Sequence, residues 1–134
     1  MSIILPTPLH ESGPRIFLIR NGAYDPKKHT FMDIMRITQG FNEILMLEDD
    51  YAVVNGYVHI SDLKNWQKAH FFQVTPSIMK KLTVYSEEAL PLNPKTSCLI
   101  NTPVIFESIF NIVKPIMQQT QIDRVSETDL NNLY

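Results

Sequence analysis

The sequence predicts an α/β domain with a mixed, mostly parallel β-sheet that is covered by helices. Short apolar runs rich in β-branched residues alternate with longer stretches of helical spacing, an order typical of parallel and mixed sheets. Hydrophobic residues make up 44% and charged residues 19% of the 134 residues, the balance of a folded globular protein. One domain over residues 1–134 is predicted, because two domains of half this length would bury little core.

Four short runs bounded by turn-forming residues are predicted strands: residues 15–20, 57–61, 96–101 and, more briefly, 123–125. Residues 5–14, which contain three prolines, are predicted to form an irregular arm. Side chains alternate between the two faces of a strand. In the run 57–61 this places Val58 and Ile60 on one face and three polar or amphipathic residues on the other: Tyr57, His59 and Ser61.

Three long stretches of helical spacing are predicted helices: residues 30–49, 75–89 and 104–117. Thr30 is the expected N-cap of the first helix, and Asp33 completes a capping box. Pro76 suits the first position of the second helix. A shorter helix is expected before it, with His70 packed rather than catalytic, and Ser126 is expected to cap a last helical turn.

The acidic residues 48–50 lie at the end of a predicted helix where the helix dipole disfavours negative charge. We therefore expect these carboxylates to meet solvent or to pair with basic residues. The single cysteine, Cys98, excludes an intrachain disulfide and favours a reducing, cytoplasmic compartment. It is expected to fill space in a buried strand.

The sequence contains no Gly-rich phosphate loop, no serine-hydrolase elbow and no His or Cys pair at metal-ligand spacing. We therefore expect neither an enzyme nor a metal or cofactor site. A formal net charge of −2 argues against a nucleic-acid-binding protein. The N-terminus does not resemble a signal peptide, and no apolar run approaches the roughly 18 residues of a membrane span.

Two features leave more than one interpretation open. The polar face of the strand 57–61, together with Ser97 and Asn101, either meets solvent or turns inward toward hydrogen-bond partners, water or a ligand. The helix 104–117 has a broader apolar surface than one packing contact requires. It is either ordinary core, a movable lid or a membrane-facing element.

Five stretches carry a resemblance to a known family: RNGAYDPKKHTFMDIMRI at 20–37, Asn55-Gly56, FQVTPSIMKKL at 72–82, EEALPLNPKTSCLINTPVIFESIFNIVKP at 87–115 and SETDLNNLY at 126–134. Together they resemble the CRAL-TRIO lipid-binding domain family, which includes α-tocopherol transfer protein and the retinaldehyde-binding proteins. The resemblance covers nearly the whole chain, and the succession of VTPS, INTP and VKP is quite specific. Against the family pattern, the chain is expected to lack the N-terminal helical subdomain and the final segment.

The resemblance implies a hydrophobic pocket on the sheet, closed by a gate helix over residues 102–117. It implies a soluble carrier of a small hydrophobic ligand, of the tocopherol, retinoid or phospholipid class. The carrier would be cytoplasmic, would release its ligand at membranes and would break no bond. Two alternatives stay open. One is a ligand-free protein-interaction module that keeps the fold, and the other is an enzyme that uses His59 with Tyr57 or Ser61 on a bound lipid.

The pocket residues that the resemblance implies come from every predicted element: Met35, Thr38, Asn42, Tyr57, His59, Ser61, Leu82, Tyr85, Ser86, Leu90, Leu92, Ser97, Leu99, Phe106, Ile109 and Phe110. Lys95 and Lys114 are the implied contacts to a membrane phosphoinositide. That contact is expected to be weak, because glutamines at 118, 119 and 121 stand where bases are expected. An uncovered helix face and an open sheet edge predict self-association.

Overall fold

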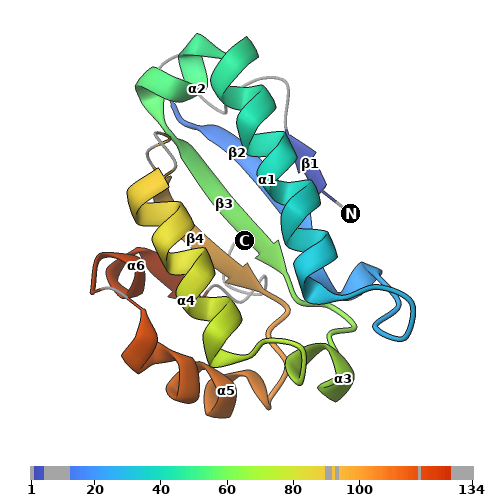
Figure 1. Ribbon diagram of the computed structural model, residues 1–134. Coiled ribbons are helices and arrows are strands. Elements are labelled where there is room, and N and C mark those ends of the chain that lie inside the picture. The colour runs from blue at the N-terminus through green and yellow to red at the C-terminus, as the bar shows by residue number, and fades with distance from the viewer. Residues whose placement is uncertain (1, 5–12, 90–91, 93, 118, 128–134) are drawn as a thin grey trace, which may run out of the picture.

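A five-stranded β-sheet forms the centre of the protein (Figure 1). The computed structural model describes residues 2–4, 13–89, 92, 94–117 and 119–127. The strands lie in sequence order across the sheet: β1 (Ser2–Ile4), β2 (Arg15–Arg20), β3 (Tyr57–Asp62), β4 (Pro94–Ile100) and β5 (Val125–Glu127). β1 runs antiparallel to β2, whereas the neighbouring strands from β2 to β5 pair in parallel. The predicted mixed, mostly parallel sheet is confirmed.

The α-helices connect and flank these strands: α1 (Phe31–Glu48), α2 (Asp50–Asn55), α3 (Lys68–Phe71), α4 (Pro76–Val84), α5 (Phe106–Val113) and α6 (Gln119–Arg124). Short 3-10 turns cover Asn21–Ala23 and Lys114–Ile116, and a π-helical turn, Tyr85–Ala89, extends α4. Right-handed crossovers between successive parallel strands place the connecting helices on one face of a sheet. In Figure 1, α1 and α4 both lie in front of the sheet.

The first long helix begins where the sequence predicts. Thr30 Oγ1 accepts a hydrogen bond from the Asp33 amide at 3.2 Å, and Asp33 Oδ2 accepts one from the Thr30 amide at 2.9 Å. This reciprocal pair is the predicted capping box, and it satisfies amides that the first helical turn leaves without partners. Thr75 caps α4 similarly, through its Oγ1 and the Ile78 amide at 3.4 Å.

The acidic cluster at the end of α1 marks the start of another helix. Asp49 Oδ1 accepts a hydrogen bond from the Ala52 amide at 3.1 Å and so caps α2. Its Oδ2 atom lies 2.7 Å from Arg15 Nε, the expected pairing with a base. Burial raises the pKa of Asp49, but the bonds from Arg15 and from the α2 backbone outweigh that effect and hold the pKa below its usual range.

Two short elements differ from the sequence prediction. Residues 2–4 form β1, which alternation cannot reveal because three residues are too few. The last predicted strand starts at Val125 rather than at residue 123, because α6 continues through Arg124. Ser126 pairs with the half-buried Cys98 in the β4–β5 ladder instead of capping a helix. That prediction is wrong because strand pairing outweighs a capping signal of two residues.

The two later helices are shorter than predicted. α4 gives way to the π-helical turn at Tyr85. α5 starts at Phe106 rather than at residue 104, and a 3-10 turn replaces its last residues. Pro115 lies in that turn, and proline both lacks an amide hydrogen and opposes the α-helical backbone before it.

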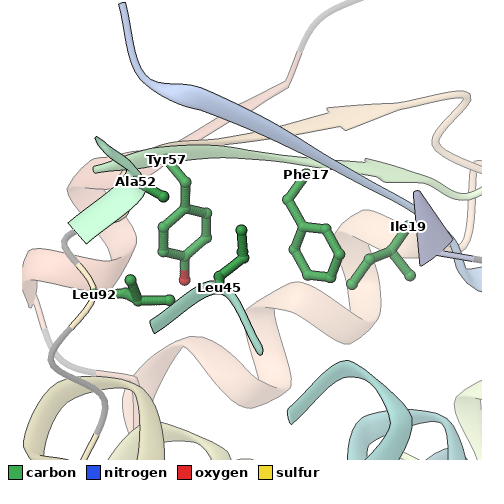
Figure 2. Close-up of a cluster of buried hydrophobic side chains, with 6 residues drawn as sticks. All are labelled: Phe17, Ile19, Leu45, Ala52, Tyr57 and Leu92. Atoms are coloured by element: carbon green, nitrogen blue, oxygen red, sulfur yellow. The ribbon is translucent and has the colours of Figure 1, made fainter. Parts of the chain in front are cut away.

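A compact hydrophobic cluster joins the sheet to α1 and α2. Figure 2 shows its members on the helix-covered side of the sheet: Phe17, Ile19, Leu45, Ala52, Tyr57 and Leu92. Phe17 and Ile19 alternate along β2 toward this side, and each is only 1% exposed. Leu92 packs in this core.

One glycine lies where the chain leaves no room for a side chain. A Cβ atom at Gly22 would lie 2.0 Å from the carbonyl oxygen of Lys64 and 2.9 Å from the amide nitrogen of Trp66. We expect Gly22→Ala to lower the free energy of unfolding by about 1–3 kcal/mol, because the backbone of both loops must shift. Gly40→Ala is the matched control. Gly40 lies in the middle of α1 with open space around it, so this substitution should raise the free energy of unfolding by about 0.5–1 kcal/mol. Urea unfolding measures both, and equal stability of Gly22→Ala and wild type would contradict this packing.

Candidate ligand cavity

A cavity of about 290 Å³ lies between the sheet and the helices on its covered face. Residues of β2, β3 and β4 line it on the sheet side, and residues of α1, α4 and the π-helical turn line it on the helix side. Phe17, Met35, Met79 and Leu82 give it a largely apolar wall. Its volume is close to the lower end of the range, about 300–1,000 Å³, that is usual for small-molecule sites.

The structure brings together nine of the residues that the sequence analysis places around a pocket. All of them line this one cavity: Met35, Thr38, Asn42, Tyr57, His59, Leu82, Tyr85, Ser86 and Ser97. The inward polar residues of α1 recur at helical spacing, and His59 is directly opposite Ser97 in the β3–β4 register. The polar face of β3 therefore turns toward the covered side of the sheet rather than toward solvent.

Other residues of that set lie elsewhere. Ser61 and Leu99 share the inward face and pair with each other, but they lie beyond the cavity toward the carboxyl ends of their strands. Leu92 belongs to the hydrophobic core. Leu90 lies outside the described residues. Strand alternation gives the face of a residue but not how far along the strand a cavity extends.

The helix expected to act as a gate does not itself line the cavity. Phe106, Ile109 and Phe110 of α5 are half-buried but do not contribute to its wall, and the Phe106 and Phe110 rings stack at 5.6 Å. The chain reaches the cavity only after the proline-containing turn, through Met117 and then Arg124. The expected position of these three α5 side chains on the pocket wall is therefore not observed.

Several lining residues were not among those singled out from the sequence: Phe17, Gln39, Met79, Thr83, Pro94, Met117, Arg124 and Val125. Helical spacing from Met35 could have identified Gln39, and strand pairing explains Phe17, which lies opposite His59 in the β2–β3 register. Met117 and Arg124 carry no local signal, because only the tertiary path of the chain brings them to the cavity.

His59 presents its imidazole to the cavity from β3. Its ring centroid lies 5.8 Å from that of Phe17, and its Nε2 atom is buried without a hydrogen-bond partner in the protein. Burial penalises the charged imidazolium and lowers the pKa of His59 to about 4. The side chain is therefore neutral at physiological pH, and Nε2 donates or accepts one hydrogen bond according to its tautomer.

Two further polar atoms of cavity-lining residues lack partners. The Tyr85 hydroxyl and Asn42 Oδ1 are both buried without a hydrogen bond. Burial raises the pKa of Tyr85, and the neighbouring Asn42 offsets part of this rise without reaching hydrogen-bonding geometry. A buried polar atom without a partner costs about 1–3 kcal/mol. Three such atoms around one cavity favour an occupant that bonds to them.

The second buried histidine has a structural role, as expected. His70 Nδ1 accepts a hydrogen bond from the Gln67 amide at 3.0 Å. Its Nε2 lies 3.1 Å from the Tyr24 carbonyl oxygen, which makes Nε2 the protonated nitrogen. The ring also meets the edge of the Tyr24 ring at 4.7 Å. Both nitrogens of His70 are thus used within the fold.

The carboxyl ends of the parallel strands, a common place for ligands, are tied together by Asp62. Its Oδ2 accepts a hydrogen bond from Arg20 Nε at 3.0 Å, and its Oδ1 accepts one from Asn101 Nδ2 at 2.8 Å. Burial raises the pKa of Asp62, but these bonds outweigh it and hold the pKa below its usual range. The carboxylate is satisfied by the fold, so the cavity is the stronger candidate site.

A family comparison agrees with this architecture. The CRAL/TRIO domain model matches residues 9–133. The chain belongs to the CRAL/TRIO domain family. Clavesin-1 of Xenopus laevis is 25% identical over 124 residues, covering 91% of this chain and 37% of that protein. Alpha-tocopherol transfer protein-like of Homo sapiens is 27% identical over 124 residues, covering 91% of this chain and 36% of that protein.

A solved structure shares the fold of this CRAL/TRIO chain. The crystal structure of Sfh5 superposes with a TM-score of 0.57 at 10% sequence identity, covering 94% of this chain and 46% of that one. The chain thus spans well under half the length of the curated relatives named above. The resemblance that the sequence motifs indicated is confirmed at the level of family and fold.

Two exposed lysines and an apolar surface lie outside the cavity of this CRAL/TRIO domain. Lys95 at β4 and Lys114 after α5 are both exposed. Val104 is 99% exposed and Ile112 is 65% exposed, so the α5 region presents apolar side chains to its surroundings. In the described part of the chain, no helix has the length and apolar character needed to cross a membrane.

Proposed function

We propose that this chain binds a small hydrophobic ligand in the cavity and releases it at membranes. The observation that carries the proposal is the cavity itself, whose largely apolar wall includes three buried polar atoms without partners. Membership of a family of lipid-binding transfer proteins supports it. The proposed ligand belongs to the tocopherol, retinoid or phospholipid class.

The cavity is proposed to bind its ligand without breaking a bond. A nucleophile needs a base within hydrogen-bonding reach. His59 Nε2 has no hydrogen-bond partner in the described part of the chain, so this atom forms no base–hydroxyl pair. Binding and release therefore suit the site better than hydrolysis or acyl transfer.

Release is proposed to occur through α5. The exposed apolar side chains of Val104 and Ile112 are more stable in a bilayer than in water, and α5 is joined through the proline-containing turn to Met117 on the cavity wall. Lys95 and Lys114 would add weak attraction to anionic lipid, including phosphoinositides, of about 1 kcal/mol each. The proposed protein is thus a cytoplasmic carrier that contacts membranes transiently.

One observation favours the alternative function, a protein-interaction module. The outer face of α1 exposes Ile37, Ile44 and Leu47, the last of which is 81% exposed. A row of apolar side chains on an outer helix face is typical of a contact surface, including one for self-association. The ligand-binding test below distinguishes the two functions, because a pure interaction module does not need an accessible cavity.

Filling the cavity from β4 is expected to abolish ligand binding. Ser97 lines the cavity opposite His59, so the ring of Ser97→Phe would occupy the volume that a ligand needs. We expect its affinity for decan-1-ol, measured by calorimetry, to fall by more than about tenfold, because the alkyl chain loses its burial. Thr96→Phe is the matched control on the opposite face of the same strand and should keep binding. Unchanged binding by a folded Ser97→Phe would place the ligand elsewhere.

A further inference from the structure

We propose that the cavity selects a ligand whose polar head is an uncharged hydroxyl, in preference to an ether, a carboxylate or a phosphate. This inference rests on the proposed function and names the chemical class of its ligand. It comes from the three buried polar atoms that line the same cavity without partners, which are His59 Nε2, Tyr85 Oη and Asn42 Oδ1.

The bonding capacities of these atoms are complementary to a hydroxyl. Asn42 Oδ1 can only accept a hydrogen bond, so its partner must be a donor. The Tyr85 hydroxyl can donate, and a ligand oxygen can accept that bond. A hydroxyl does both at once, because it has one hydrogen and two lone pairs. An ether or an ionised carboxylate has no hydrogen to give to Asn42 Oδ1, and a hydrocarbon satisfies none of the three atoms.

The charge of the site also favours an uncharged head. His59 stays neutral down to a pKa of about 4, and Tyr85 stays neutral because burial raises its pKa. Arg124 is the single cation among the described lining residues, and it already interacts with another group of the chain. An anionic head would therefore leave water for a largely neutral, apolar wall, which is far more costly than moving a hydroxyl.

Three ligands with the same alkyl chain test the head group directly. Calorimetry at neutral pH would measure the affinities of the protein for decan-1-ol and for decanoate. The affinity for 1-methoxydecane would be measured by its displacement of decan-1-ol. We expect the alcohol to bind about fivefold or more tighter than the ether, although the ether is the more hydrophobic, because only the alcohol can donate to Asn42. Decanoate should bind about tenfold or more weakly than the alcohol.

The outcomes separate this inference from the proposed function. If the ether or decanoate binds as tightly as the alcohol, the preference for a hydroxyl is wrong while ligand binding stands. If none of the three binds, both the inference and the proposed function fail.

Single substitutions locate the preference at named atoms. Tyr85→Phe removes the Tyr85 hydroxyl, and Asn42→Leu removes the Asn42 amide with its Oδ1 atom. We expect Asn42→Leu to weaken decan-1-ol binding about three- to tenfold while leaving 1-methoxydecane unchanged. Tyr85→Phe should weaken the binding of both ligands, because an ether oxygen can also accept the bond from Tyr85. Met35→Leu, an apolar change on the same wall, is the control and should preserve the alcohol-to-ether ratio.

The stability of the two variants without ligand distinguishes a role of these polar atoms in ligand binding from a structural role in the fold. Removing a buried polar atom that has no partner relieves a cost, so both variants should be as stable as wild type or more stable without ligand. A purely structural role would instead lower the unfolding midpoint. An alcohol-to-ether ratio that stays at the wild-type value in Asn42→Leu would overturn the proposal.

Discussion

Replacing Phe106 and Phe110 together by aspartate is expected to abolish the acceleration of ligand release by membranes. The two rings stack on α5 and are half-buried in the protein. Exposing such a side chain to water costs roughly 1.5–3 kcal/mol, so a movement of α5 that exposes both is rare in water. A bilayer accepts the same rings, which makes opening easier at its surface. Two carboxylates on this face would oppose insertion.

The measurement is the release of tritiated hexadecan-1-ol from the protein with and without phospholipid vesicles. Wild type should release it much faster when vesicles are present, and the double variant should not. Ile37→Asp with Ile44→Asp adds the same charge in place of two exposed apolar residues of α1 and serves as the control. If wild type releases its ligand equally fast without vesicles, α5 is ordinary packing and not a gate.

Acid is expected to destabilise the protein through His59. The imidazole takes up a proton near pH 6.5 in the unfolded chain, but only near pH 4 in the fold, where burial lowers its pKa to about 4. Between these values the unfolded state binds more protons, so stability falls as the pH falls. Above pH 6.5 the stability linked to His59 is fully present. By about pH 4 the proton uptake of the unfolded chain has lowered the free energy of unfolding by about 3 kcal/mol.

Urea unfolding of wild type and His59→Phe at several pH values measures this contribution. The cavity beside His59 gives room for the larger ring, and the variant should lack the additional loss of stability between pH 6.5 and about pH 4. Met35→Leu, on the wall of the same cavity, leaves every titratable group in place; it is the control and should retain the wild-type pH dependence. Identical pH profiles for wild type and His59→Phe would show that His59 is not held neutral by the fold.

Local sequence predicts the elements whose signals lie within them. β2 spans the residues expected for it, because a short apolar run that contains two isoleucines lies between Pro14 and Asn21. The Thr30 capping box fixes the start of α1 in the same way. β1 is missed because three residues show no period, and α6 displaces the start of β5 because strand pairing and tertiary packing decide that boundary.

The candidate site is predictable only as far as periodicity reaches. Alternation along β3 places His59 on the inward face, and helical spacing places Thr38 and Asn42 on the inward side of α1. The limits of the cavity are set by contacts between distant segments, so Ser61 falls beyond it while Met117 falls on its wall. No local pattern distinguishes these two outcomes.

The central claim, that a hydroxyl-bearing hydrophobic molecule occupies the cavity, is tested most directly by native mass spectrometry of the protein purified from cells. The account predicts one additional small-molecule mass per chain, which organic solvent releases. The released molecule should have a long apolar body and a hydroxyl head, and Ser97→Phe should lack it. A folded wild-type chain that shows only its own mass, with nothing in the solvent extract, would contradict the claim.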